Sequence, residues 1–157
     1  MRRPKQLDSP VVPKAMKAVS RANVWLYRRT NGRIGGTWRV GSAFPRGIPM
    51  CLLTTRGRKS GEPRTAPLLY LRDGERVVLV ASQGGLPKDP QWYRNLRHDP
   101  DVIVRTGAAE QRMRARTADG EERDRLWARL VAHYRDFASY QSWTDRSIPV
   151  VVCEPAG

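Results

Sequence analysis

The first patterned stretch of the chain carries apolar residues at helical spacing. Between Pro13 and Arg29, apolar side chains recur at this spacing and basic side chains lie between them. The pattern predicts an amphipathic helix, which ends at the glycine-rich segment 30–36. Residues 1–12 are charged and show no such period, so we expect a flexible basic tail there.

Short apolar runs separated by turn-forming residues follow the helix and predict strands. These runs are 49–55, 65–71, 77–80, 102–105, 111–115 and 148–153. Asp73-Gly74 indicates a hairpin between the second and third runs, and Gly107 indicates one between the fourth and fifth. Cys51 and Cys153 both fall inside apolar runs, so we expect buried free thiols and no metal site.

Two further helices are predicted among the strands. Asp89-Pro90 indicates the start of a short helix, with Asp89 as its N-cap. Residues 119–135 form the clearest helical pattern, in which Asp119 and Glu122 have the spacing of a capping box. Hairpin-linked strands with flanking helices predict an α+β fold whose small antiparallel sheet closes into a barrel.

The net positive charge of the chain favours an anionic binding partner. The chain has 29 lysines and arginines against 15 acidic residues, a net charge of +14. This excess favours nucleic acid, an anionic membrane surface, or a small molecule rich in phosphate and carboxylate groups. The basic residues are spread along the whole chain, which argues against a nucleic-acid-binding stripe. A basic helix at 13–29 is compatible with peripheral contact with a membrane, although packing on its own domain is favoured.

No apolar run is long enough to cross a membrane, and no secretory signal pattern follows the charged start. We therefore expect a cytoplasmic protein, with peripheral attachment at the inner membrane face as the alternative.

The first segment with candidate chemistry is a basic, glycine-flanked loop. It reads Gly57-Arg58-Lys59-Ser60-Gly61 and is followed by Arg64. Glycines expose backbone N–H groups, and the cations and the hydroxyl add donors, which suits a phosphate or a carboxylate. A solvated basic hairpin tip has the same composition, and the spacing of a Walker A loop is absent.

The second segment, Ser82-Gln83-Gly84-Gly85, precedes a helix N-terminus, where free amides and the helix dipole favour an anion. On that helix Gln91 and Asn95 share one face, with Trp92 beside them. Amides and an indole suit a planar heteroaromatic ligand. Trp92 is equally well explained as a residue of the hydrophobic core.

The third segment is an aromatic cluster of Tyr134, Phe137, Tyr140 and Trp143. These side chains read either as the lining of a pocket or as the plug of a small barrel. No serine–histidine–acid set and no paired carboxylates accompany them, so we expect a cofactor to carry the chemistry.

Taken in order, these segments resemble the deazaflavin-dependent nitroreductase family, split-barrel oxidoreductases that bind reduced coenzyme F420. The matching stretches are 53–64, 71–74, 81–85, 90–96 and 140–155, with 23–29 near the start. The resemblance implies that residues 13–157 form a single split-barrel deazaflavin-binding domain. It also implies a ligand with a phosphate, a carboxylate and an oligoglutamate tail, in agreement with the net charge of +14.

The resemblance also implies roles for individual residues. The phosphate and tail would contact Arg58, Lys59 and Ser60, and the cofactor would run along Arg64, Thr65, Ala66, Pro67, Leu68 and Leu69. The ring would lie among Ser82, Gln83, Gln91, Trp92, Asn95 and Phe137. The catalytic residues facing the acceptor would be Ser82, Tyr134 and Tyr140.

The expected reaction is hydride transfer from reduced coenzyme F420 to a small-molecule electron acceptor. Phe137 and Leu69 replace tyrosines of the family's nitroimidazole-reducing member, and Gln83 replaces a lysine. The lost hydroxyl near the acceptor favours a quinone or an enone over nitro compounds. The alternatives are a split-barrel oxidoreductase that binds FMN and a non-catalytic basic module that binds nucleic acid. The oligomeric state is left open.

Overall fold

The computed structural model describes residues 11–39 and 41–156, with side chains from residue 18 onward. Helix α1 (Val11–Thr30) matches the predicted amphipathic helix and begins two residues earlier. The predicted tail, 1–12, therefore falls outside the described residues apart from its last two positions. Tyr27 is 1% exposed and anchors α1 to the sheet. Its hydroxyl accepts from the backbone N–H of Gly107 (2.7 Å) and donates to the Met50 carbonyl (3.1 Å).

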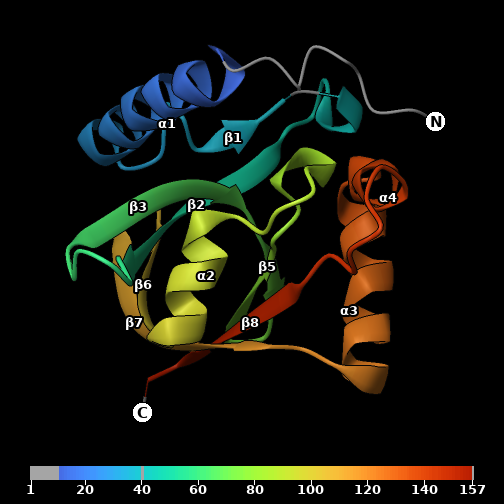
Figure 1. Cartoon of the computed structure of the whole chain (residues 1–157). Helices are drawn as coiled ribbons and strands as arrows, with labels where there is room; N and C mark the ends of the chain where they lie inside the picture. Colours follow the sequence, from blue (N-terminus) through green and yellow to red (C-terminus); the bar gives the residue numbers. More distant parts are fainter. Residues whose placement is uncertain (1–10, 40, 157) are drawn as a thin grey trace.

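The strands form one curled antiparallel sheet (Figure 1). They are β1 (Thr37–Trp38), β2 (Ile48–Arg56), β3 (Pro63–Leu69), β4 (Leu71–Asp73), β5 (Arg76–Val80), β6 (Asp101–Thr106), β7 (Ala109–Thr117) and β8 (Val150–Pro155). The order is β1-β2-β6-β7-β8-β5-β4, and β3 pairs with β2. Within the described residues β3 has a ladder on one side only, so the barrel is split along its other edge.

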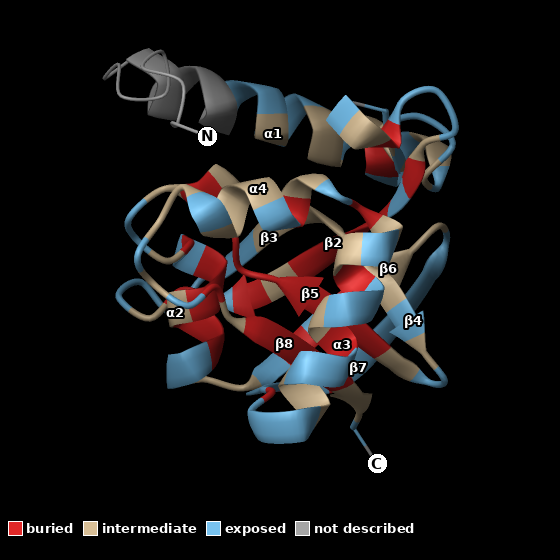
Figure 2. Ribbon diagram, turned by 90° about the vertical axis from the view of Figure 1, so that its right-hand side faces the viewer, coloured by how far each residue is buried: buried red, intermediate tan, exposed pale blue. Residues whose placement is uncertain are grey.

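Alternation along the central strands creates two apolar layers. Val77 and Leu79 of β5 point into the barrel, whereas Val78 and Val80 point outward. The inner layer is closed by α2 (Gln91–His98), which packs Trp92, Tyr93 and Leu96 against it. The outer layer is covered by α3 (Gly120–His133) and α4 (Asp136–Ser142) (Figure 2). Strands β5 and β8 are therefore buried on both faces.

The predicted α+β split barrel is confirmed, with several local corrections. Neither helix α4 nor the two-residue strand β1 is predicted by the sequence pattern. Asp89 does not cap α2, because Pro90 occupies the N-cap position. Asp119 occupies the N-cap of α3 but makes no side-chain cap bond.

The expected capping box of α3 is wrong for a physical reason. The Glu122 carboxylate accepts two hydrogen bonds from the Arg116 guanidinium, at 2.6 and 3.0 Å. A bidentate ion pair of this kind is stronger than a neutral cap bond. Cys51 and Cys153 are free and fully buried, as expected. No helix in the described part of the chain is both long and apolar enough to span a bilayer.

Candidate active site

The basic loop connects β2 to β3 as a tight turn. The Gly57 N–H donates to the Glu62 carbonyl and the Gly61 N–H donates to the Gly57 carbonyl, both at 2.8 Å. Gly61 has a φ of 73°, a conformation that favours glycine. The Glu62 N–H donates to the Ser60 hydroxyl (3.2 Å), which fixes the tip of the turn. Lys59, Ser60 and Arg64 are exposed around it. We call residues 57–61 the cradle.

The buried side chain of Asn95 hydrogen-bonds to Arg58 of the cradle. Its side-chain oxygen accepts from the Arg58 guanidinium (2.9 Å) and from the Arg58 backbone N–H (3.3 Å). Its side-chain nitrogen donates to the Thr55 hydroxyl (3.2 Å). Asn95 is 4% exposed, so both ends of its amide are committed to the protein. Its predicted contact with a ring stays a prediction, whereas its contact with Arg58 is a feature of the fold.

Strand β3 presents a half-buried surface next to the cradle. Residues 65–69 are all of intermediate exposure. Ala66 and Leu68 pack on the inner layer, while the Thr65 hydroxyl accepts a hydrogen bond from Arg28 of α1 (3.0 Å). Because the second edge of β3 has no ladder among the described residues, its backbone polar groups can bind an extended ligand. The expected run of the ligand along residues 64–69 stays a prediction.

The Ser82–Gly85 segment includes a short 3-10 turn, η3 (Gln83–Gly85), in an unusual conformation. Gln83, Gly84 and Gly85 have consecutive φ values of 46°, 62° and 77°. A Cβ at Gly84 would meet nothing within 4 Å, whereas one at Gly85 would lie 2.6 Å from the Tyr140 carbonyl oxygen. The turn thus packs against α4 on one side and is open on the other. Ser82 is 9% exposed beside it.

Gln83 and Gln91 are both exposed, and Trp92 is not. Turned so that its nitrogen faces the chain, the Gln83 amide donates to the Lys88 carbonyl (3.0 Å). Trp92 is 8% exposed and packs edge-on against Tyr93, with ring centroids 6.3 Å apart. Trp92 therefore belongs to the core in this structure, and its approach to a ring stays a prediction.

Arg146 connects the Ser82–Gly85 segment to the neighbouring loop. The sequence pattern does not predict this role. Its guanidinium donates to the carbonyls of Ser82 (2.6 Å), Ala81 (3.1 Å) and Leu86 (2.9 Å) and pairs with Asp89 (2.9 Å). Burial lowers the pKa of Arg146, and the Asp89 carboxylate opposes that shift. One arginine in a loop has no spacing signal, so only the fold reveals this role.

The aromatic cluster forms a hydrogen-bonded series. The indole N–H of Trp38 donates to the Tyr134 hydroxyl (3.2 Å), which lies 3.2 Å from the Tyr140 hydroxyl. Tyr134 is 2% exposed and Phe137 is 4% exposed, and their rings pack edge-on at 5.0 Å. Trp38 and Tyr140 are both of intermediate exposure, so Tyr140 carries the hydroxyl of the series that can meet a ligand.

The environment keeps both tyrosines protonated. Burial raises the pKa of Tyr134 well above its usual range, and its hydrogen bond with Tyr140 adds to that shift. Burial also raises the pKa of Tyr140, and the hydrogen bond from Tyr134 opposes this rise. Both residues are therefore neutral phenols near neutral pH and can act as hydrogen-bond donors.

The structure thus brings most of the predicted site residues to two neighbouring regions. The first holds the cradle and β3, and the second holds Ser82–Gly85, α4 and Tyr140. Tyr134, Phe137 and Trp92 lie in the core behind these regions. Within the described residues no cluster of three histidines, cysteines or carboxylates could hold a metal ion.

Comparisons with known proteins identify relatives of this chain. Residues 19–155 match the sequence model of the F420H(2)-dependent quinone reductases. The Mycobacterium tuberculosis protein Rv3178, whose name places it among these quinone reductases, is 47% identical over 74% of this chain and 98% of its own length.

Solved structures show the same fold. The F420-H2 dependent reductase FDR-A is 42% identical and superposes with a TM-score of 0.64, over 68% of this chain and 94% of its own. A Listeria innocua protein titled as a pyridoxamine 5'-phosphate oxidase, only 18% identical, superposes with a TM-score of 0.50 over 69% of this chain and 84% of its own. This second likeness shows the split-barrel fold alone. The match over residues 19–155 and the close relatives establish that the chain belongs to the F420H(2)-dependent quinone reductase family.

Proposed function

We propose that this member of the F420-dependent oxidoreductases transfers a hydride from reduced coenzyme F420 to a quinone or a similar electron-poor carbonyl acceptor. The observation that carries the proposal is the packing of Tyr140 on the Ser82–Gly85 segment. The Tyr140 backbone lies against Gly85 of this segment, and Tyr140, which is of intermediate exposure, carries a hydroxyl donor. The cradle is the connection between β2 and β3 of the same sheet. The net reaction moves a hydride and a proton to the quinone, giving a hydroquinone and oxidised F420.

The residues present suit this cofactor. Arg58, Lys59, Ser60 and Arg64 supply the cations and the hydroxyl that a phosphate and carboxylates need. The turn leaves free space over Gly84, where a planar ring can approach the backbone. The indole N–H of Trp143 is buried and has no hydrogen-bond partner in the described part of the chain. An orphaned donor next to Tyr140 is consistent with a site that a ligand completes.

When bound, the deazaflavin supplies the hydride, so the protein needs only to position the reactants and stabilise charge. Tyr140 donates to the acceptor oxygen, where negative charge develops during reduction. Tyr134 is too buried to touch the acceptor and serves as a positioning residue that donates to Tyr140. Ser82 offers a second hydroxyl beside the open turn. Phe137 adds no donor, which favours quinones and enones over nitro compounds.

Two titrations test the cofactor assignment. The purified protein is titrated with coenzyme F420 and, in parallel, with FMN, and tryptophan fluorescence is followed. We expect saturable binding of F420 and much weaker binding of FMN, followed by turnover of reduced F420 with quinones. Selective binding of FMN would support the alternative oxidoreductase. Binding of neither, with steeply salt-dependent binding to duplex DNA, would support the nucleic-acid module.

A peripheral membrane contact through residues 13–29 stays a proposal, as does a cytoplasmic location. Val19 is 69% exposed and Trp25 is 60% exposed on α1, and the Arg29 guanidinium lies 5.7 Å from the Trp25 ring. Exposed apolar groups among cations suit an anionic lipid surface. Co-sedimentation with anionic and with neutral vesicles tests this contact, and equal retention in the supernatant would rule it out.

A further inference from the structure

One guanidinium group joins the two ends of the Ser82–Gly85 turn. The side chain of Arg146 is 15% exposed. It donates hydrogen bonds to three backbone carbonyls, those of Ala81, Ser82 and Leu86, at 3.1, 2.6 and 2.9 Å. Ala81 and Ser82 precede the 3-10 turn η3, and Leu86 follows it. A single planar group therefore fixes the entry and the exit of this turn together.

The main chain of Arg146 is bound to α4, the helix that carries Tyr140. Gln141 of this helix donates from its side-chain nitrogen to the Arg146 carbonyl (2.8 Å). The side-chain oxygen of Gln141 accepts from the Ile148 backbone N–H (2.9 Å). Both ends of the Gln141 amide are thus committed to the loop that contains Arg146. Arg146 therefore connects α4 to the Ser82–Gly85 turn, main chain on one side and side chain on the other.

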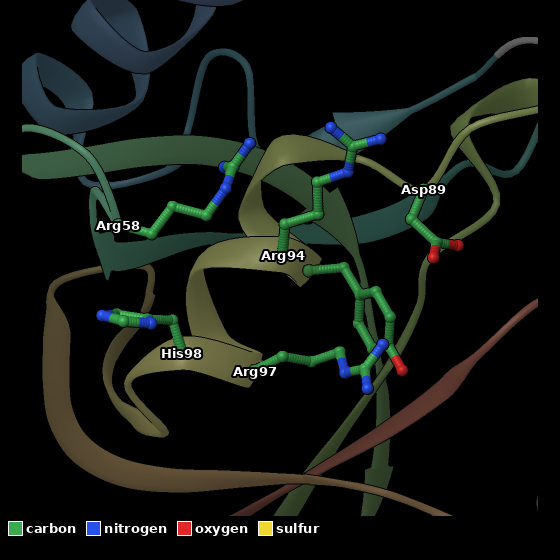
Figure 3. A pocket seen from close by; sticks show the side chains of 6 residues that line it. Arg58, Asp89, Arg94, Arg97 and His98 are labelled. Atoms are coloured by element: carbon green, nitrogen blue, oxygen red, sulfur yellow. The ribbon is translucent and has the colours of Figure 1, made fainter.

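Asp89 supplies the fourth partner of the guanidinium. Its carboxylate pairs with Arg146 at 2.9 Å, which compensates a positive charge that is largely removed from water. Figure 3 shows Asp89 on the segment that leads into α2, with its carboxylate directed away from the side chain of Arg58. The Nε, Nη1 and Nη2 atoms of Arg146 all donate to protein oxygens. Arg146 therefore acts through the segments that it binds and not by contact with a ligand.

We propose that Arg146 is a positioning residue for hydride transfer, which keeps Ser82 and Tyr140 in a fixed relative arrangement. The inference rests on the proposed function and extends it to a residue outside the reacting groups. Ser82 and Tyr140 lie on separate segments, and Arg146 binds the backbone of the first directly and α4 through Gln141. Two hydroxyl groups can serve one electron acceptor only if both stay aligned, and a misplacement of about 1 Å can cost about 100-fold in rate.

The test uses Arg146→Lys, which keeps the positive charge but cannot reproduce the planar fork that reaches several acceptors at once. The control is Arg105→Lys. Arg105 is also of intermediate exposure and joins separate segments, since it donates to the Gly107 carbonyl (2.9 Å) and to the Asn31 side chain (2.8 Å). Each change is made in the wild type and in Tyr140→Phe. Single-turnover rates with reduced F420 and a quinone, F420 dissociation constants and thermal melting are measured for every protein.

We expect Arg146→Lys to lower the rate of hydride transfer about tenfold, and Arg105→Lys to lower it less than about twofold. The dissociation constant of F420 should change less than the rate. In the Tyr140→Phe background the loss caused by Arg146→Lys should shrink to about twofold, because one of the two aligned hydroxyls is already absent. Equal losses for the two lysine variants, or the same loss for Arg146→Lys in both backgrounds, would overturn the positioning role and leave the proposed function intact. If the wild type does not oxidise reduced F420 with a quinone, the proposed function fails together with this inference.

Discussion

The hydroxyl groups of Tyr134 and Tyr140 lie 3.2 Å apart, although Tyr134 is buried in the core and Tyr140 is of intermediate exposure. The indole of Trp38 can only donate, so its bond to Tyr134 leaves the Tyr134 proton free to point at Tyr140. The Tyr140 proton is then directed away from the core. A strand of two residues, β1, thus sets the orientation of the Tyr140 hydroxyl.

Replacing Trp38 by phenylalanine should lower kcat about fivefold and leave the dissociation constant of F420 unchanged. The loss corresponds to about 1 kcal/mol, the value of one hydrogen bond that orients a catalytic group. Steady-state kinetics with a quinone, together with F420 titration, measure the two effects separately. Trp127→Phe, a change on α3 outside the site, is the matched control. An equal decrease in both variants would show a general effect on folding.

Tyr140→Phe should lower kcat by about 100-fold, because it removes a donor to the developing negative charge. The dissociation constant of F420 should change little, since the cradle is untouched. In the Trp38→Phe/Tyr140→Phe double variant the Trp38 substitution should have no further effect, because Trp38 acts through Tyr140. Additive losses in single-turnover measurements would contradict the series from Trp38 to Tyr140.

Asn95→Ala should both destabilise the fold and weaken F420 binding. It removes the acceptor that fixes Arg58 and leaves the buried Thr55 hydroxyl without its donor. The free energy of unfolding should fall by about 1–3 kcal/mol in urea titrations. Asn95→Asp keeps an acceptor for Arg58 and removes the donor to Thr55. It should bind F420 more tightly than Asn95→Ala, and the reverse order would exclude a role for Asn95 in holding the cradle.

Lys59→Ala should raise the dissociation constant of F420 by about tenfold, the loss expected for one hydrogen bond to a charged group. Lys59 is exposed at the tip of the cradle, so salt should shrink this difference. Arg112→Ala, on the distant strand β7, removes one charge in the same way and serves as the control. Unchanged affinity in Lys59→Ala would remove this lysine from the site.

The free energy of unfolding should fall in mild acid because the Glu122 carboxylate becomes protonated there. Hydrogen bonds from Arg116 lower the pKa of this carboxyl from its ordinary value of 4.5, despite the opposing effect of burial. A carboxyl with a lowered folded pKa stabilises the fold above its unfolded pKa and loses that contribution as pH falls below 4.5. Urea unfolding at pH 7 and in this acid range should show a smaller decrease for Glu122→Gln than for the wild type. Parallel decreases in the two proteins would assign acid sensitivity to other groups.

The sequence predicts well where a segment carries its own periodic pattern. The apolar runs of β5 and β8, the Asp73-Gly74 hairpin and the helix at 120–133 all follow from the local sequence. Helix α4 escaped prediction because its seven residues are too few for a helical period and are rich in aromatics. The capping box predicted for α3 is wrong because the Glu122 carboxylate pairs with Arg116 of β7 instead.

The site residues divide in the same way. The basic turn at 57–61 could be recognised because its glycines and cations are consecutive. The roles of Trp38, Asn95 and Arg146 depend on hydrogen bonds between segments that are far apart in the sequence. Asn95 is 37 positions from its partner Arg58, Arg146 is 57 positions from Asp89, and Trp38 is 96 positions from Tyr134. Contacts of this kind leave no local signature. They became visible only when the fold brought the segments together.

The split in the barrel gives the enzyme a route to new substrates in evolution. Asn95 and Thr55 hold the cradle, whereas Arg146 and α4 hold the Ser82–Gly85 turn, and no hydrogen bond seen in the described residues joins the two supports. Under the proposed function, substitutions in α4 can therefore reshape the acceptor side while Asn95 and Thr55 keep the cradle in place. A lineage built on this chain can keep one electron donor and diversify the molecules it reduces.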